Sequence, residues 1–231
     1  MVEKMDKQMI AHIYDRESNT YDAKYQKQIH LIEDKIVGNI IKPLLKEYRQ
    51  SVLEIGCGTG HVISLANIDH LNYQGIDISK ASVEKARKKY PKHFFTVADI
   101  TSCEPKRKND LVLMIYGQIN YIGLQESIEL LKQFCKSFIH SKFVCIMYCG
   151  KGHEDYNYTK TLQKFYKPSE IKKTFKSILG IDINLYGFSF LDVKEDYEIQ
   201  LNETLKTKMD DGQEMRCKYL ILSNVEIFNE R

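Results

Sequence analysis

The 231-residue sequence has little that would assign it to a special class of protein. Its six cysteines include no C-x-x-C pair, and no cysteine or histidine falls at a spacing typical of metal ligands. Several of the cysteines lie in apolar runs, where a free thiol behaves as a small hydrophobic side chain. These absences exclude a disulfide framework and a metal centre from our interpretation, and we expect a reduced, intracellular protein.

Neither charge nor hydrophobicity indicates a nucleic acid or a membrane as partner. The sequence has 34 lysine and arginine residues against 31 aspartate and glutamate residues, and a net charge of +3 is too small to indicate a polyanionic partner. No apolar run reaches the roughly 18 residues of a membrane-spanning helix, and residues 1–7 are too charged for a signal peptide. We therefore expect a cytoplasmic protein with neither kind of partner.

The most informative stretch is Ser51–Gly60, SVLEIGCGTG. Val52, Leu53 and Ile55 form a short apolar run suited to a buried strand, three glycines follow at alternate positions, and a helix-like run begins at His61. Glycine permits positive φ and a close approach of ligand to backbone, while free N–H groups at a helix start favour an electron-rich ligand. A dinucleotide fingerprint would need glycine in place of His61, so a nicotinamide cofactor is disfavoured.

Two further strand-like segments end near an acidic residue. Residues 73–79 contain Asp77 and residues 94–100 contain Asp99. Asp77 follows Gly60 by 17 residues, close to the spacing of about 20 at which an acidic residue meets a ribose in nucleoside-binding α/β folds. A helix N-cap is the alternative role for this carboxylate. Because parallel strands present their carboxyl ends at one edge of a sheet, the three strand ends together predict a nucleoside site.

The middle of the chain alternates between strand-like and helix-like segments. Residues 110–115 and 143–149 are continuous apolar runs, typical of parallel strands buried on both faces, and residues 124–138 between them favour a helix. A polar, tyrosine-rich loop over residues 151–166 and a helix over about 169–178 follow. The alternation predicts parallel strands that are joined by right-handed crossovers.

The N-terminal 48 residues predict helices. Apolar side chains recur at three- and four-residue spacing between Ile29 and Leu44, and such a stripe packs against another element. Pro43 should kink or end that helix near the first strand. The preceding residues, 13–25, are rich in tyrosine and charge, and one interpretation is an amphipathic helix pair that covers a sheet edge.

The C-terminal segment changes character. Residues 183–191, 197–205 and 215–227 are strand-like, and the last two flank Asp210-Asp211-Gly212. This turn signal predicts an antiparallel hairpin. With 43% hydrophobic residues, the whole chain can bury one full core.

The E-x-G-x-G-x-G pattern headed by Glu54, followed by Asp77 and Asp99, resembles the class I S-adenosylmethionine (SAM)-dependent methyltransferases. The resemblance covers roughly residues 50–150, with the C-terminal hairpin as general support. It implies an α/β fold: a Rossmann-like three-layer sandwich with a mostly parallel seven-stranded sheet, an antiparallel C-terminal hairpin and an N-terminal helical lid. We expect residues 1–48 to form the lid and residues 49–231 the SAM-binding domain.

The resemblance also implies S-adenosyl-L-methionine as cofactor and methyl transfer as reaction. In this family, the residue at the position of Asp77 binds the ribose, and the residue at the position of Asp99 accepts from the adenine amino group. The resemblance implies that Ile78 and Ile100 flank the adenine ring. Tyrosines of the N-terminal segment lie near the methionine end. The residues expected to bind the cofactor are Tyr21, Glu54, Gly56, Cys57, Gly58, Gly60, Asp77, Ile78, Asp99, Ile100 and Tyr116, with packing as the main role of Cys57.

The absence of several family motifs narrows the range of possible methyl acceptors. Tyr116-Gly117-Gln118 stands where enzymes acting on adenine or glutamine nitrogen carry D/N-P-P-Y/F, and no cysteine follows a proline, as cytosine-5 enzymes require. The magnesium carboxylates of catechol-type enzymes and the paired-glutamate loop of arginine methyltransferases are missing as well. The resemblance therefore implies a small-molecule acceptor that is methylated on nitrogen or oxygen.

Candidate acceptor residues come from the tyrosine-rich N-terminal segment and from the loops after the fourth and fifth strands. They are Tyr14, Tyr25, Gln118, Asn120, Tyr121 and Tyr148. His153 is the candidate general base because its reference pKa lies near neutrality, and Tyr116 is the second candidate catalytic residue. A surface position for His153 and sheet packing for Tyr148 are the alternatives. A peptide or protein amine as acceptor, a non-catalytic SAM-binding subunit and a homodimer also remain open.

Overall fold

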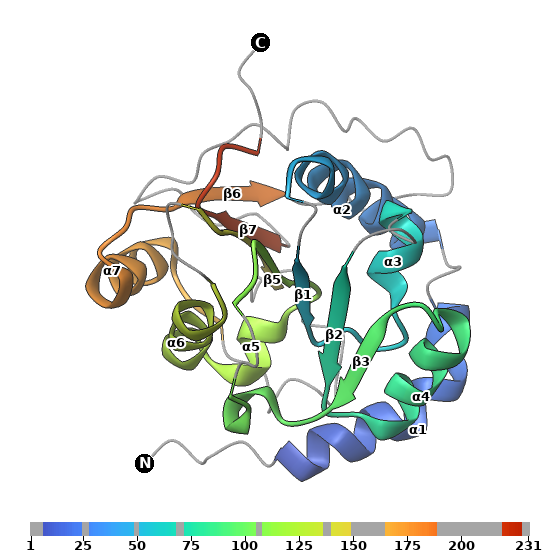
Figure 1. Ribbon diagram of the computed structural model, residues 1–231. Helices are drawn as coiled ribbons and strands as arrows, with labels where there is room; N and C mark the ends of the chain where they lie inside the picture. The colour runs from blue at the N-terminus through green and yellow to red at the C-terminus, as the bar shows by residue number, and fades with distance from the viewer. Residues whose placement is uncertain are drawn as a thin grey trace. The chain divides into compact units, whose positions relative to one another are not determined.

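The computed structural model describes residues 7–24, 28–48, 51–67, 72–104, 108–135, 140–148, 165–188 and 219–227. The strands in this part of the chain are β1 (Val52–Ile55), β2 (Tyr73–Asp77), β3 (Phe94–Val97), β4 (Leu111–Met114), β5 (Lys142–Tyr148), β6 (Asn184–Phe188) and β7 (Tyr219–Ser223). They form a seven-stranded sheet in the order β3-β2-β1-β4-β5-β7-β6 (Figure 1). Strand β1 pairs in parallel with β2 and β4, and β2 with β3, whereas β7 is antiparallel to β5 and β6. The predicted mostly parallel sheet with an antiparallel C-terminal element is confirmed.

Helices flank this sheet. They are α1 (Lys7–Lys24), α2 (Gln28–Glu47), α3 (His61–Ala66), α4 (Lys80–Lys89), α5 (Gln118–Ile122), α6 (Leu124–Phe134), α7 (Pro168–Leu179) and a 3-10 helix, η1 (Ile100–Ser102). The prediction of helices before the first strand is confirmed for α1 and α2. Pro43 lies inside α2 and does not end it, because Leu44 and Leu45 beyond it are buried in the core.

The chain divides into two compact units. The first unit comprises Met1–Leu113 and Gln133–Lys142, and the second comprises Met114–Lys132 and Phe143–Arg231. Within the first unit, α4 packs on β2 and β3, α2 packs on α3, and α1 runs alongside α4 (Figure 1). The unit therefore carries the glycine-rich turn and both acidic strand ends that the sequence singles out.

Two predicted strands are shorter than their apolar patterns suggest. Strand β2 stops at Asp77 because Ser79 is the N-cap of α4, and its side chain accepts from the backbone N–H of Ser82 at 3.1 Å. Strand β3 stops at Val97 because Asp99 caps η1. Each loop thus begins with an acidic residue whose side chain bonds the backbone that follows.

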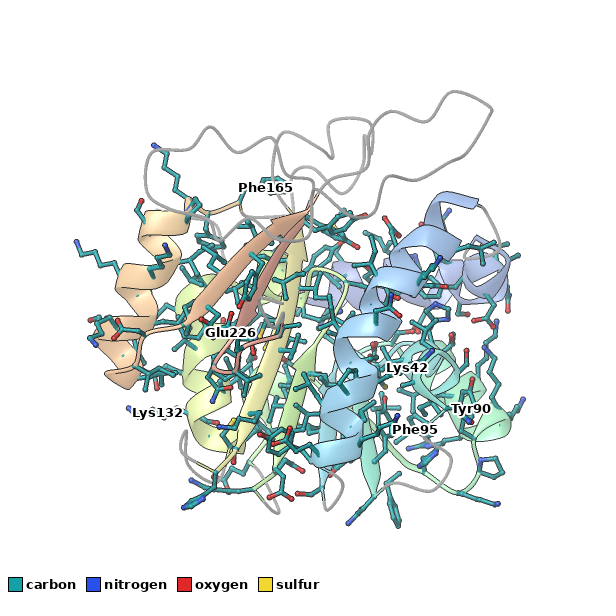
Figure 2. The ribbon with its side chains drawn as sticks, turned by 90° about the horizontal axis from the view of Figure 1, so that it is seen from above. Lys42, Tyr90, Phe95, Lys132, Phe165 and Glu226 are labelled. Atoms are coloured by element: carbon teal, nitrogen blue, oxygen red, sulfur yellow. The ribbon has the colours of Figure 1, made fainter. Side chains whose placement is uncertain are left out.

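The second unit shows one correction to the predicted hairpin. The expected partner of the last strand was residues 197–205, but both edges of β7 are occupied, by β5 and by β6. A strand with two neighbours suits the fully buried Tyr219–Ser223 segment. The hydroxyl of Tyr186 on β6 donates to Glu226, which follows β7 and is labelled in Figure 2, at 2.6 Å. Residues 197–205 and 210–212 lie outside the described residues.

Candidate cofactor site

The turn after β1 has the geometry that its glycines permit. Gly56, Gly58 and Gly60 all have left-handed φ angles, of 76°, 52° and 81°. A side chain at Gly60 would also collide with the ring of Tyr90, whose carbons would lie 2.9 Å from a Cβ atom (Figure 2). Only glycine satisfies both conditions without strain.

Asp77 holds this turn and the start of α4 together. Its Oδ2 accepts from the backbone N–H of Gly58 at 2.8 Å, and its Oδ1 accepts from that of Ser79 at 2.8 Å. Burial and the charge of Asp15 raise its pKa, although the N–H groups of Ser79 and Gly58 act in the opposite direction. A carboxylate offers roughly four lone-pair sites, so Asp77 can still accept from a ribose hydroxyl.

Asp99 occupies the corresponding position after β3. Its Oδ1 accepts from the backbone N–H and the hydroxyl of Thr101, at 3.0 and 2.7 Å, and its Oδ2 lies 3.0 Å from the ammonium of Lys7. Burial raises the pKa of Asp99, but hydrogen bonds from Thr101 and Lys7 outweigh it, so the pKa lies below its usual value. The next side chain, Ile100, is buried, whereas Ile78 after β2 is half-buried.

Glu54 lies inside the first unit, below the turn. Only 2% of the residue is exposed, and the buried hydroxyl of Tyr73 donates to its Oε2. Burial raises the pKa of Glu54 to about 8, the hydrogen bond from Tyr73 lowers it in part, and the charge of Asp77 raises it further. The hydrogen bond from Tyr73 to Glu54 is therefore structural, and the predicted contact of Glu54 with a cofactor stays a prediction.

Cys57 packs against Gly75 of β2, where an added Cβ atom would lie 2.7 Å from Sγ and 2.9 Å from the ring of Phe95. We expect Gly75→Ala to destabilise the protein by about 1–3 kcal/mol through overpacking. Gly38→Ala on α2 is the matched control, because a Cβ atom there meets nothing closer than 3.7 Å and helix propensity favours alanine by roughly 1 kcal/mol. Urea unfolding of both variants measures the difference, and equal stability would contradict the packing argument.

Helix α1 contacts all three of these strand-end loops. Asp22 accepts from the Thr59 hydroxyl in the glycine turn, Asp15 accepts from Ser79 and Ala81 after β2, and Lys7 pairs with Asp99 after β3. Sequence reasoning missed these acidic residues. Their spacing of seven residues places them on one face of a helix, but nothing local identifies the loops that they reach.

The tyrosines expected from the N-terminal segment lie on the same helix. A ring carbon of Tyr21 is 3.9 Å from the position that a Cβ atom would take at Gly58, so this ring lies against the glycine turn. Tyr14 contacts Tyr21 edge to face, with ring centroids 6.3 Å apart. Tyr25 lies outside the described residues, as does His153.

The candidate acceptor residues of the second unit cluster around α5. Tyr116 has a left-handed φ of 58°, which is uncommon for a residue other than glycine and often marks a functional site. The ring of Tyr148 packs so closely on Gly117 that no Cβ atom would fit between them. The Asn120 amide is buried and bonds both the N–H and the carbonyl of Tyr148, at 2.8 and 3.0 Å.

This packing gives Asn120 a structural use, since it ties α5 to the end of β5. Gln118 is half-buried and Tyr121 is buried on the same short helix. The roles of Gln118, Asn120, Tyr121 and Tyr148 toward an acceptor stay predictions. The same holds for Tyr116 as a catalytic and cofactor-binding residue. Residues 116–122 were expected to form an open loop, and a helix forms there because Ile119 and Tyr121 are buried.

Within the described part of the chain, no group of three or more histidine, cysteine, aspartate or glutamate side chains could hold a metal ion. No helix within the same residues is long and apolar enough to cross a membrane.

Comparisons with known sequences match parts of the chain. A family model described as "Methyltransferase domain" matches residues 52–138. A malonyl-[acyl-carrier protein] O-methyltransferase of Anoxybacillus flavithermus is 32% identical over 120 residues, which are 49% of this chain and 43% of that protein. An uncharacterised protein of Methanocaldococcus jannaschii is 29% identical over 126 residues, 54% of this chain and 46% of that protein. The chain thus spans less than half the length of these curated relatives.

Solved structures match the fold over almost the whole chain. A SAM-dependent methyltransferase of Thermotoga maritima, titled a possible histamine N-methyltransferase, has a TM-score of 0.67 and 17% identity and covers 92% of this chain and 97% of its own. The magnesium protoporphyrin IX methyltransferase of Synechocystis was solved with bound SAH. It has a TM-score of 0.62 and 15% identity, and the match covers 94% of this chain and 98% of that one. These likenesses establish the fold.

The fold and the domain match point in the same direction. Residues 52–138 match a methyltransferase domain, and the sheet around them has the fold of the solved SAM-dependent methyltransferases. The resemblance inferred from Glu54, the glycine turn and the two acidic strand ends is therefore confirmed.

Proposed function

We propose that this protein is an enzyme that transfers the methyl group of S-adenosyl-L-methionine to a nitrogen or oxygen atom of a small metabolite. The observation that carries the proposal is that Asp77 joins the left-handed glycine turn to the start of α4, in a segment that matches a methyltransferase domain. Residues 1–48 would act as a lid on the domain that residues 49–231 form.

The residues of the first unit fit this cofactor. Gly56 and Gly58 of the glycine turn are only partly buried and carry no side chain, so a ligand can approach their backbone closely. Asp77 would accept from the ribose hydroxyls and Asp99 from the adenine amino group, while Ile78 and Ile100 would flank the ring. Tyr21, whose ring lies against Gly58, would border the methionine portion.

When bound, S-adenosyl-L-methionine would supply an electrophilic methyl group to a lone pair of the acceptor. The protein's main task is then to orient the acceptor, since approximation supplies much of the rate. The proposed acceptor-binding side chains are Tyr14, Tyr25, Gln118, Asn120, Tyr121 and Tyr148. Tyr116 is a proposed catalytic and cofactor-binding residue, and His153 is the proposed base for an acceptor that must lose a proton.

The proposed acceptor class has two rivals. A peptide or protein amine keeps the chemistry and changes the substrate, and a non-catalytic SAM-binding subunit keeps only the binding. An oxygen acceptor gains support from the relative that is named an O-methyltransferase. A cytoplasmic location gains support from the cysteines in the described part of the chain, which are free thiols, as expected in a reducing compartment.

Calorimetric titration with SAM, SAH and NAD⁺ tests the cofactor. We expect saturable binding of SAM and SAH and no heat from NAD⁺. Transfer of a labelled methyl group to panels of small amines, carboxylic acids and short peptides then tests the acceptor. Binding of NAD⁺ without a response to SAM would contradict the proposed function, and methylation of peptides alone would favour the first rival.

A further inference from the structure

Helix α1 carries two carboxylates that act on neighbouring loops of the first unit. Asp15 and Asp22 are seven residues apart, which is about two helical turns, so both lie on the same face of α1. Each accepts a hydrogen bond from a loop that also bonds Asp77. Neither residue lies at a strand end or belongs to the glycine motif.

Asp22 acts on the glycine turn through Thr59. The Thr59 hydroxyl donates to Asp22 Oδ1 at 2.7 Å, and Thr59 is 0% exposed, although it lies between two left-handed glycines. The other oxygen of Asp22 pairs with Lys89 on α4. Asp22 therefore connects the turn after β1 with the far end of α4, and its charge is compensated by that lysine.

Asp15 acts on the first turn of α4. Its Oδ1 accepts from the Ser79 hydroxyl at 2.6 Å and from the backbone N–H of Ala81 at 3.0 Å. Ser79 in turn donates its backbone N–H to Asp77. A carboxylate at a helix N-terminus satisfies an N–H group that has no partner within the helix, so Asp15 contributes to holding this turn in place.

We propose that Asp15 and Asp22 are positioning residues of the cofactor site. From α1 they hold the two loops whose separation the Asp77 carboxylate bridges, and they do so without having to touch the cofactor. This inference rests on the proposed function, because it assigns those loops to nucleoside binding. Loss of either carboxylate leaves a loop less restrained, so the site must be ordered again when the cofactor binds.

Binding kinetics test the inference in Asp15→Asn and Asp22→Asn, which keep side-chain size and remove the charge. We expect SAM to dissociate about tenfold faster from each, the size expected for one charge-assisted hydrogen bond. KM for SAM should rise while kcat at saturating SAM is unchanged. Arg16→Gln, at an exposed position of the same helix, is the matched control and should leave both values unchanged.

A double-mutant cycle tests whether Asp22 acts through Thr59. Thr59→Val removes the hydroxyl at nearly constant volume, and Asp22→Ala removes the acceptor of that hydroxyl. The double variant should release SAM no faster than the more affected single variant. Additive effects, or dissociation rates equal to wild type in both aspartate variants, would overturn the proposal.

Amide hydrogen exchange without cofactor separates this inference from the proposed function. We expect residues 56–60 to exchange about tenfold faster in Asp22→Asn and residues 79–82 about tenfold faster in Asp15→Asn, relative to Arg16→Gln. Unchanged exchange would overturn the positioning role even if SAM binds. Faster exchange in a protein that does not bind SAM would contradict the proposed function and leave the positioning of the loops supported. If a variant fails to fold, wild-type exchange decides: we expect SAM to slow exchange in both loops, and no change would overturn the inference.

Discussion

Asp77→Ala is expected to weaken SAM binding by about 1–3 kcal/mol, a loss of roughly 5- to 150-fold in affinity. The direct cause is the loss of charge-assisted hydrogen bonds to the ribose. A second cause is that the backbone N–H groups of Gly58 and Ser79, each 2.8 Å from the carboxylate, lose their acceptor. Both loops of the site then become less ordered, so we expect a value in the upper part of this range. Titration calorimetry measures the change.

Two further variants sharpen this experiment. Asp77→Asn keeps the size but places an amide NH₂ opposite one of the two backbone N–H groups, so a similar loss assigns the effect to charge and hydrogen-bond polarity. Asp182→Ala removes a carboxylate whose side chain is 87% exposed, and it should leave affinity unchanged. If Asp77→Ala binds SAM as tightly as the wild type, Asp77 is not part of the cofactor site.

Glu54→Gln is expected to change the pH dependence of stability. Burial raises the pKa of Glu54 from 4.5 to about 8, so the folded protein holds this proton more tightly than the unfolded chain does. The contribution of protonated Glu54 to the free energy of unfolding is fully present below about pH 4.5 and is lost as the pH rises toward 8. Glutamine does not titrate. The free energy of unfolding of the variant should therefore rise relative to that of the wild type, by up to about 1.4 kcal/mol for each pH unit in this window.

Urea unfolding at three pH values between 5 and 8, chosen to span this window, measures the gain, because each midpoint and slope gives a free energy of unfolding. The glutamine side chain in this variant can still accept from the Tyr73 hydroxyl, so the comparison isolates the charge at this position. Glu84→Gln is the control, since it makes the same substitution at a side chain that is 52% exposed. If the free energy of unfolding changes with pH in the same way in the wild type and in Glu54→Gln, burial of Glu54 does not affect its titration.

Local patterns predicted the cofactor-binding half of the fold because its signals lie within short stretches. Val52 to Ile55 is apolar enough to be a buried strand, and the glycines that follow are the residues that tolerate the observed left-handed angles. The acids at 77 and 99 lie where their strands end, since a side chain that bonds the following backbone also terminates a strand. Each of these features depends on a few neighbouring residues.

Other features depend on contacts between distant segments, and the sequence did not reveal them. The expected pairing of residues 215–227 with 197–205 rested on a turn signal, but β7 lies between β5 and β6, where its buried side chains have neighbours on both sides. Pro43 was expected to kink or end α2, and it does not end the helix, because packing of Leu44 and Leu45 continues it to Glu47. In both cases burial outweighed a local preference.

The sequence by itself determined the class of protein, because the glycine turn and the order of acidic strand ends are encoded by residues close together along the chain. Only the tertiary structure decided which side chains support that turn. Asp15 and Asp22 are ordinary acidic residues of an amphipathic helix until folding brings them to Ser79 and Thr59, 64 and 37 residues away. Hydrogen bonds over such separations depend on how α1 packs against α4, and no pattern within α1 specifies that packing.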